Sequence, residues 1–280
     1  TIYLIKELVI NGVISGGDVF YVNADDSYNG LIEKTALAEQ YGFHMLAPAH
    51  NGFETKGLTI HMETMITQGS AKGKVIILDT LKKFADLMDK KNSSEFMNTA
   101  RAFVSKGGTL ILLAHTNKNR DASGKVIAGG TSDIVDDADC AYTLDESGNN
   151  DELKTVLFEN IKLRGNVALE LGFTYSTASD QTYEQRLNSI TALAGAEIIQ
   201  QKKSIVIAEN VKKDQSIIDA ISAVLNQSDR LKTDLVSTIH ASDSFPVRRI
   251  NEVLRLYERD KWFLVPSGKN AKKYRLKGKS

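Results

Sequence analysis

The sequence predicts an α/β protein, with a mostly parallel sheet flanked by helices, followed by a small module of helices and a hairpin. Residues 75–78 and 109–114 are apolar without alternation, which is typical of strands buried on both faces of a parallel sheet. Segments with helical periodicity alternate with such strands over about the first 175 residues. The last 65 or so residues, with a different pattern, predict the separate module.

The predicted elements of the first part follow in regular order. Helices are expected at residues 1–14, 28–41, 58–68 and 93–106, and strands at 18–23, 44–46, 74–79 and 109–114. Gly16 and Gly17 end the first helix, and the Pro- and Gly-containing residues 47–57 form a loop. Further strands are expected at 139–144, 151–162 and 165–175. The last two form a hairpin, which predicts antiparallel strands on one edge of the parallel sheet.

Charge divides the chain in two. Residues 212–280 hold 15 Lys and Arg against 8 Asp and Glu, whereas residues 1–211 hold 20 against 27. An acidic body with a basic tail predicts two modules, the second facing a polyanion. We therefore expect a first domain at 1–178, a helix and linker at 179–212, and a basic domain at 213–280.

The composition is that of an ordinary globular protein, 42% hydrophobic and 25% charged. Cys140 is the only cysteine, so no internal disulfide can form and a cytoplasmic location is expected. No apolar run approaches the roughly 20 residues of a membrane helix, so no membrane association is expected. The sequence begins at Thr1, inside a predicted helix, and we expect a fragment of a longer protein.

Polar residues follow three predicted strands at the point where each ends. Asp25 and Asp26 follow the first, Asp79 ends the second and His115 follows the third. The carboxyl ends of parallel strands border the crevice in which such sheets bind ligands. Two acids for a metal and a water, with a polar group beside them, are components of nucleotide hydrolysis. Alternatively, the acids cap the following helices and His115 is satisfied locally.

These residues resemble the RecA-type ATPase core of hexameric replicative helicases of the RepA and DnaB kind. The resemblance rests on residues 21–27, 75–84, 112–118, 129–136 and 160–165, and covers about the first 175 residues. It implies ATP and Mg²⁺ as cofactors, with Asp79 organising Mg²⁺ through water. Asp25 stands where the family has the glutamate that polarises the attacking water. Because Asp is one methylene shorter, Asp26 is an alternative for that role, and His115 resembles the polar sensor of the γ-phosphate.

The resemblance also implies a homo-oligomeric ring. Lys162 and Arg164 resemble the pair that reaches the nucleotide of the neighbouring subunit, and their alternative is a solvated basic hairpin. In such a ring, Lys118, Arg120 and Lys125 would lie on a loop contacting single-stranded DNA in the channel.

One family motif is missing, because the sequence contains no Gly-x-x-x-x-Gly-Lys-Ser/Thr loop. In the family this loop directly precedes the helix that here starts at Thr1, which makes Thr1 a candidate nucleotide-binding residue. We therefore expect the chain to be truncated within or just past the loop, to bind ATP weakly and to hydrolyse almost none.

The basic tail predicts three helices, at 215–225, 231–239 and 246–257, and a hairpin of 262–265 with 272–276. This order resembles a winged helix-turn-helix. Seven cations and no acids between Lys261 and Lys279 are typical of phosphate-backbone binding, here to duplex DNA. The candidate contacts are Arg248, Arg249 and Arg255 on the recognition helix, and Lys269, Lys272, Lys273 and Arg275 on the wing. The alternative is a protein-interaction module with a solvated basic face.

Together these features predict an ATP-dependent, nucleic-acid-stimulated motor of the replicative helicase or recombinase type. A plasmid, phage or other mobile element is the expected source, and DNA replication the expected process. The alternative is a non-catalytic DNA-binding regulator or loader that retains a RecA-like scaffold.

Overall fold

The structure is a computed structural model that describes residues 1–48, 53–84, 90–117, 120–121, 126–129, 132–150, 152–267 and 271–278. The chain divides into two compact units, Thr1–Lys202 and Lys203–Ser280. The boundary falls inside the long helix α7 (Gly195–Gln227), at the end of the region in which the sequence predicts a helix and linker.

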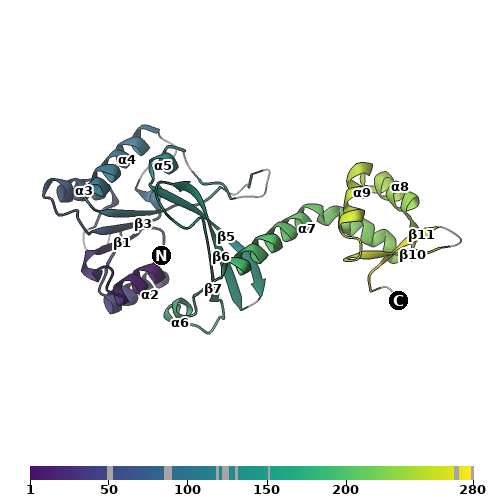
Figure 1. The fold of residues 1–280 in the computed structure, drawn as a ribbon, viewed down its shortest axis with the longest axis horizontal. Helices are drawn as coiled ribbons and strands as arrows, with labels where there is room; N and C mark the ends of the chain where they lie inside the picture. Colours follow the sequence, from purple (N-terminus) through teal and green to yellow (C-terminus); the bar gives the residue numbers. More distant parts are fainter. Residues whose placement is uncertain are drawn as a thin grey trace. The chain divides into compact units, whose positions relative to one another are not determined.

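The first unit alternates strands and helices for most of its length (Figure 1). Its strands are β1 (Val19–Asn23), β2 (His44–Leu46), β3 (Val75–Asp79), β4 (Thr109–Leu113), β5 (Cys140–Asn150), β6 (Leu153–Leu163), β7 (Glu170–Ser176) and β8 (Thr191–Ala192). Its helices are α1 (Ile2–Ile10), α2 (Tyr28–Tyr41), α3 (Leu58–Thr67), α4 (Lys90–Ser105), α5 (Ser132–Asp137) and α6 (Tyr183–Asn188), with short 3-10 helices η1 (Gly16–Asp18), η2 (Thr55–Gly57) and η3 (Leu81–Lys83).

Four of these strands form the predicted parallel sheet, in the order β2-β1-β3-β4. The protein is therefore a mixed α/β fold, as the unalternating apolar runs predict. In the register of the sheet, Asn23 on β1 lies opposite Asp79 on β3, and Asp79 lies opposite Leu113 on β4. The carboxyl ends of these three strands thus meet at one edge.

Each face of the parallel sheet has its own core (Figure 1). On one face Val22, Ile76 and Leu78 pack against side chains of α3 and α4, including Met62 and Phe103. On the opposite face the sheet packs against side chains of α1, α2 and α6, namely Ile2, Ile5, Leu37, Ala38 and Leu187. Helix α1 ends before the predicted residue 14, because Gly12 takes a left-handed backbone (φ 67°) directly after its C-cap Asn11.

The antiparallel strands form a sheet of their own, in the order β5-β6-β7-β8. The prediction that they form an edge of the parallel sheet is wrong for the described residues, because these strands find their partners among themselves. One face of this sheet is covered by the start of α7, where a Cβ on Gly172 would lie 3.0 Å from Ile198. Glycine at this position lets the helix approach the sheet.

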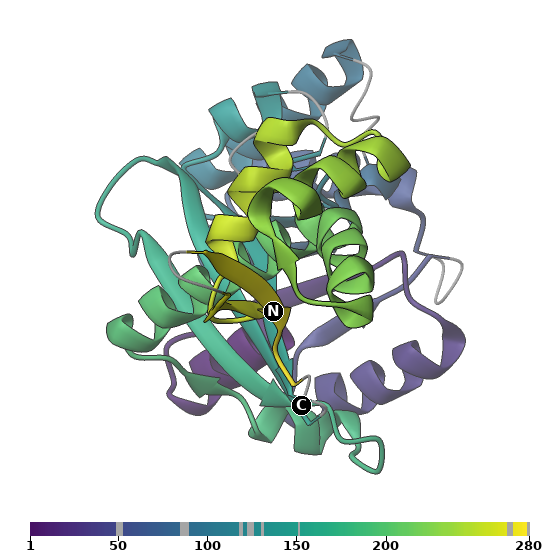
Figure 2. The same ribbon diagram turned by 90° about the vertical axis from the view of Figure 1, so that its right-hand side faces the viewer.

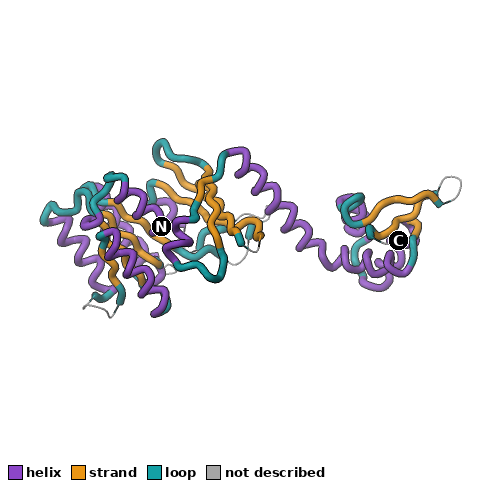
Figure 3. The backbone as a smooth tube through the Cα atoms, turned by 90° about the horizontal axis from the view of Figure 1, so that it is seen from below, coloured by secondary structure: helices purple, strands orange, loops and turns teal. Residues whose placement is uncertain are grey.

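The second unit contains the rest of α7, then β9 (Arg230–Leu231), α8 (Lys232–Asp243), α9 (Val247–Leu256), β10 (Trp262–Pro266) and β11 (Lys272–Leu276). Strands β10 and β11 form the predicted hairpin, and β9 adds a short third strand that the sequence pattern does not predict. Figure 2 faces this unit and shows its green and yellow-green helices gathered together with the yellow hairpin, whose strands are orange in Figure 3. Helix α7 begins well before residue 215, where the sequence predicts its start.

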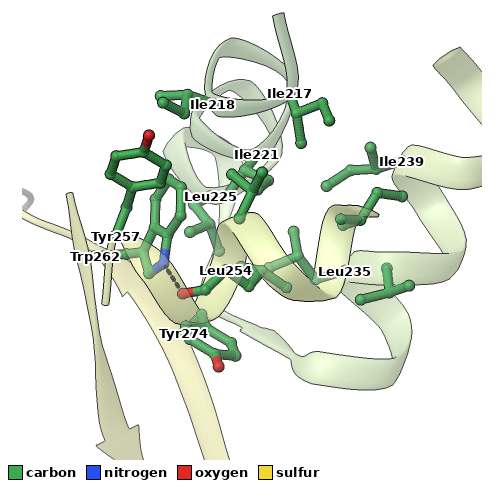
Figure 4. Close-up of a cluster of buried hydrophobic side chains, with 13 residues drawn as sticks. Ile217, Ile218, Ile221, Leu225, Leu235, Ile239, Leu254, Tyr257, Trp262 and Tyr274 are labelled. Atoms are coloured by element: carbon green, nitrogen blue, oxygen red, sulfur yellow. Dashed lines mark hydrogen bonds between the residues drawn. The ribbon is translucent and has the colours of Figure 1, made fainter. Parts of the chain in front are cut away.

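A single cluster of apolar side chains holds the second unit together (Figure 4). Trp262 is fully buried there, and its indole Nε1 donates a hydrogen bond to the Leu254 carbonyl at 2.9 Å. Ile221 and Leu225 of α7, and Leu235 and Ile239 of α8, complete the centre of this cluster. Among the described residues, no helix has the length and apolar character needed to cross a membrane.

Candidate functional site

The carboxyl edge of the parallel sheet brings together the polar residues that follow its strands. The amide of Ala24, just after β1, donates to the Asp79 carbonyl at 2.6 Å. Thr80, which follows Asp79 through a cis peptide bond, donates from Oγ1 to the Leu113 carbonyl at 2.9 Å. These bonds tie the ends of β1, β3 and β4 together, so Asp25, Asp26, Asp79 and His115 leave the sheet from adjacent points.

Asp79 is held by a buried tyrosine. The Tyr21 hydroxyl donates to Asp79 Oδ2 at 2.6 Å, and Tyr21 is only 2% exposed. Burial, then the hydrogen bond to Asp79, raises the pKa of Tyr21, so this hydroxyl remains a donor. Because the carboxylate is fixed on one oxygen and a quarter exposed, Asp79 presents a defined anionic group at the sheet edge.

Asp26 is paired with a lysine of the following helix. Lys34 Nζ lies 2.5 Å from Asp26 Oδ2 and 4.0 Å from Asp79 Oδ2, so one cation serves both carboxylates. Asn23 Nδ2 also donates to Asp26, at 3.0 Å. Partial burial opposes ionisation, but the hydrogen bonds from Lys34 and Asn23 hold the pKa of Asp26 below its usual range.

Asp25 faces away from this pair, towards three basic side chains. His115 Nε2 donates to Asp25 Oδ2 at 3.2 Å, and the ammonium groups of Lys82 and Lys83 lie 3.4 and 3.6 Å from its oxygens. The hydrogen bond from His115 is the largest cause that keeps the pKa of Asp25 low, with Lys82 contributing more than Lys83. Asp25 is therefore anionic at neutral pH and its charge is locally neutralised.

The capping alternative for these acids is wrong. Ser27 is the N-cap of α2, and its Oγ accepts from the Gly30 amide at 3.3 Å. The short helix η3 has Thr80 as its N-cap, not Asp79. None of the three carboxylates is thus required to cap the first turn of a helix.

The predicted nucleotide-binding residue Thr1 also borders the edge, together with Tyr183 and Lys34, which the sequence pattern does not single out. Burial lowers the pKa of the Thr1 amino group while Asp79 raises it, which places Thr1 beside Asp79. The pKa of Tyr183 in α6 is raised by burial and further by the charges of Asp26 and Asp79, opposed by that of Lys34. Tyr21 lies in the motif 21–27, whereas no local pattern distinguishes Lys34 from the other lysines of the chain.

Lys162 and Arg164 lie at a different place, beside the end of α5. Arg164 donates from Nη2 to the Asp136 carbonyl at 2.9 Å, and Lys162 Nζ lies 4.0 Å from Asp136 Oδ1. Arg164 also approaches Asp139, which receives a closer bond from Arg101 at 2.6 Å. The two cations share one acidic neighbourhood, and none of the contacts described joins them to Asp25, Asp26 or Asp79.

The basic residues assigned to nucleic acid differ in how they are engaged. Arg120 makes a two-pronged ion pair with Asp145 of β5, with both bonds 2.7 Å long. Arg249 binds the buried Asp214 and also Glu252, and Arg275 binds Asp229. Arg248 pairs with Glu252 at 3.1 Å but is 91% exposed. The predicted contacts Lys118, Lys125 and Lys269 lie outside the described residues.

Three of the predicted contacts have no ion pair with any part of the chain that the structure describes, namely Arg255, Lys272 and Lys273. Arg255 and Lys272 are exposed and Lys273 is half-buried. Their charges are therefore available to an external anion, in contrast to those of Arg249 and Arg275.

The sheet edge supplies some of the groups that bind an Mg²⁺-nucleotide. Mg²⁺ in proteins is commonly held by one or two carboxylates together with waters and substrate phosphates. Asp79 and Asp26 supply the carboxylates, and the buried Asn23 Oδ1 has no hydrogen-bond partner within the described segments. In the described part of the chain no three His, Cys, Asp or Glu side chains form a metal cluster, so the protein alone would supply few ligands.

No protein-family model matches this chain, and no curated protein sequence does either.

Proposed function

We propose that this chain carries the catalytic edge of an ATP-dependent, nucleic-acid-stimulated motor with a RecA-like core, of the replicative helicase or recombinase type. The observation that carries the proposal is the meeting of Asp25, Asp26, Asp79 and His115 at the carboxyl edge of a four-stranded parallel sheet. Ligands of open α/β sheets bind at this edge.

The site residues divide into two groups with separate tasks. Asp79, oriented by Tyr21, is suited to hold the water shell of Mg²⁺, and Asn23 Oδ1 is a further acceptor beside it. Asp25, whose carboxylate accepts a hydrogen bond from His115 just after β4, is suited to orient a water and to link its position to the loop that follows β4. ATP with Mg²⁺ would supply the transferable phosphoryl group.

A ring of subunits is the second part of the proposal. Lys162 and Arg164 would act on the nucleotide of the neighbouring subunit, with the fork of Arg164 suited to phosphate oxygens. Both have side chains that are at least a quarter exposed beside α5. If sites are shared, mixing Arg164→Ala protein with Asp79→Asn protein restores part of the ATPase activity. If the mixture shows no more ATPase activity than the sum of the two proteins measured separately, the shared site is contradicted.

The second unit would bind duplex DNA as a winged helix. Three helices followed by a hairpin support this assignment, as do the unpaired charges of Arg255, Lys272 and Lys273. In this reading α9 is the recognition helix and β10–β11 the wing.

One observation favours the alternative of a non-catalytic DNA-binding regulator or loader. A general base must take up a proton, yet Asp25 has a lowered pKa and is neutralised by His115, Lys82 and Lys83.

The deciding experiment measures ATP hydrolysis with and without single-stranded DNA, using the protein as its gene encodes it. The motor predicts DNA-stimulated hydrolysis that is lost in the Asp79→Asn variant and retained in Asp18→Asn, because Asp18 lies in η1 directly before β1, at the opposite end of that strand from the carboxyl edge. DNA binding without Asp79-dependent hydrolysis would instead establish the regulator.

A further inference from the structure

Lys34 occupies an unusual place for a lysine. It projects from α2 with only 16% of its side chain exposed, and its ammonium group lies between the Oδ2 atoms of Asp26 and Asp79. The ammonium group of Lys34 therefore pairs directly with Asp26 and lies at the limit of ion-pair distance from Asp79.

The amide of Asn23 shows that this cluster is incomplete. Asn23 is 3% exposed and donates from Nδ2 to Asp26, which fixes the orientation of the amide because a carboxylate can only accept. Its Oδ1 is then left buried with no hydrogen-bond partner among the residues that the structure describes. A buried acceptor without a partner costs free energy, which a bound cation or its water would recover.

We propose that Lys34 is a built-in cation that occupies the position of a hard divalent metal between Asp26 and Asp79. Metal and lysine then compete for the same carboxylates, and Lys34 neutralises these carboxylates whenever no metal is bound and opposes the entry of free metal. The inference rests on the proposed function, because it assigns a regulator to the same carboxylate edge.

Three observations carry this competition. Lys34 is the described side-chain cation that lies within ion-pair distance of both Asp26 and Asp79, and Mg²⁺ and similar ions prefer carboxylate and amide oxygens such as those of Asp26, Asp79 and Asn23. A positive charge at 2.5–4.0 Å from these oxygens repels a second cation strongly. Lys34 must therefore swing away, or be neutralised by an anion, before a metal binds.

The experiment measures Tb³⁺ binding to the full 280-residue chain by luminescence sensitised through tyrosine, with Mg²⁺ added as a competitor. Tyr21, bonded to Asp79, and Tyr183 lie close enough to the site to serve as antennae. Tb³⁺ is a hard, oxygen-seeking ion that stands in for Mg²⁺.

The Lys34→Met variant is expected to bind Tb³⁺ about tenfold more tightly than the unchanged chain. The Lys34→Arg variant keeps the charge and should bind as weakly as the unchanged chain. Lys74→Met is the matched control, since it removes an equally close lysine from Asp18 in the same unit and should have no effect. Adding Asp79→Asn to Lys34→Met should abolish the gain.

Equal Tb³⁺ affinity in the unchanged chain and in Lys34→Met, or no binding by either, would overturn the inference. Circular dichroism verifies that each variant is folded, and Lys34→Gln provides a second neutral variant with the same expectation. Equal Tb³⁺ affinities combined with Asp79-dependent ATP hydrolysis would contradict the role of Lys34 and leave the proposed motor unaffected. Tighter metal binding by Lys34→Met, together with no ATP hydrolysis by the protein as its gene encodes it, would support the metal site and contradict the motor.

Discussion

Nε2 of His115 lies 3.2 Å from Oδ2 of Asp25, although the two residues are 90 positions apart in the sequence. The contact joins the loop after β1 to the loop after β4, across β3 that lies between them in the sheet. A hydrogen bond of this kind links the two outer members of the site directly. It therefore offers a first measurable property of the site that does not depend on nucleotide.

We expect the His115→Ala substitution to raise the pKa of Asp25 towards its ordinary value, because the hydrogen bond from His115 is the largest cause that lowers it. The measurement is the titration of the Asp25 carboxyl carbon by NMR. His44→Ala is the control, since His44 contacts the Gly17 carbonyl and not Asp25. An unchanged Asp25 titration in His115→Ala would contradict the contact.

The pairing of Asp26 predicts a pH dependence of stability. Burial opposes its ionisation, but Lys34 and Asn23 lower the pKa of Asp26 in the folded state. Because the pKa of Asp26 is lower in the folded chain than in the unfolded chain, ionised Asp26 stabilises the fold at pH values above its unfolded-state pKa. This stabilisation is lost as the pH falls through its folded-state pKa. The free energy of unfolding of the first unit, measured by urea denaturation followed by circular dichroism, should therefore decrease less at acid pH in Asp26→Asn than in the unchanged chain.

We expect Arg249 to act in folding rather than in DNA contact. Asp214 is 1% exposed and accepts bonds from Arg249 and from the Tyr257 hydroxyl, which lies 3.1 Å away. Removing Arg249 leaves this buried carboxylate with one donor fewer, at a cost of about 2 to 3 kcal/mol in the free energy of unfolding. Arg248→Ala is the matched control and should change stability little, because Arg248 is almost fully exposed.

Fluorescence of Trp262, the only tryptophan of the chain, reports this unfolding directly because it is buried in the core of the second unit. A midpoint in urea that is equal for Arg249→Ala and Arg248→Ala would show that the Asp214 contact contributes nothing to the fold.

The free charges of the hairpin predict how DNA binding depends on salt. Lys272 and Lys273 have no ion pair with the described residues, whereas Arg275 is bound to Asp229. Replacing both lysines by alanine should weaken binding to a DNA duplex and reduce the slope of log affinity against log salt by about 2. Fluorescence anisotropy at several salt concentrations measures the slope. A slope that falls equally in Arg275→Ala would contradict the distinction between free and paired charges.

The sequence predicts the parallel sheet and the residues at its edge well, because long apolar runs are buried on both faces and their ends are marked by charged residues. Asp25, Asp79 and His115 are found at adjacent strand ends for this reason. Their proposed roles in nucleotide chemistry remain predictions.

The contacts of single cations are harder to predict. Lys34 lies in an ordinary helical segment, and only the tertiary fold places it between two carboxylates. Arg249 belongs to a basic run that suggests DNA, yet it binds Asp214, 35 residues earlier in the chain. The pairing of β5 to β8 into a separate sheet likewise depends on which strands meet, and local alternation carries no information on that choice.

Ser27 caps α2, so the residue that starts the helix differs from the acidic residues that carry the charge of this loop. Since a hydroxyl satisfies the first turn, Asp25 and Asp26 can be exchanged for their amides one at a time without unravelling the helix behind them. The start of α2 and the charged groups of the edge are thus encoded by neighbouring but distinct positions, so the Asp25 variant leaves the cap of α2 in place, whereas the Asp26 variant also removes the partner of Lys34.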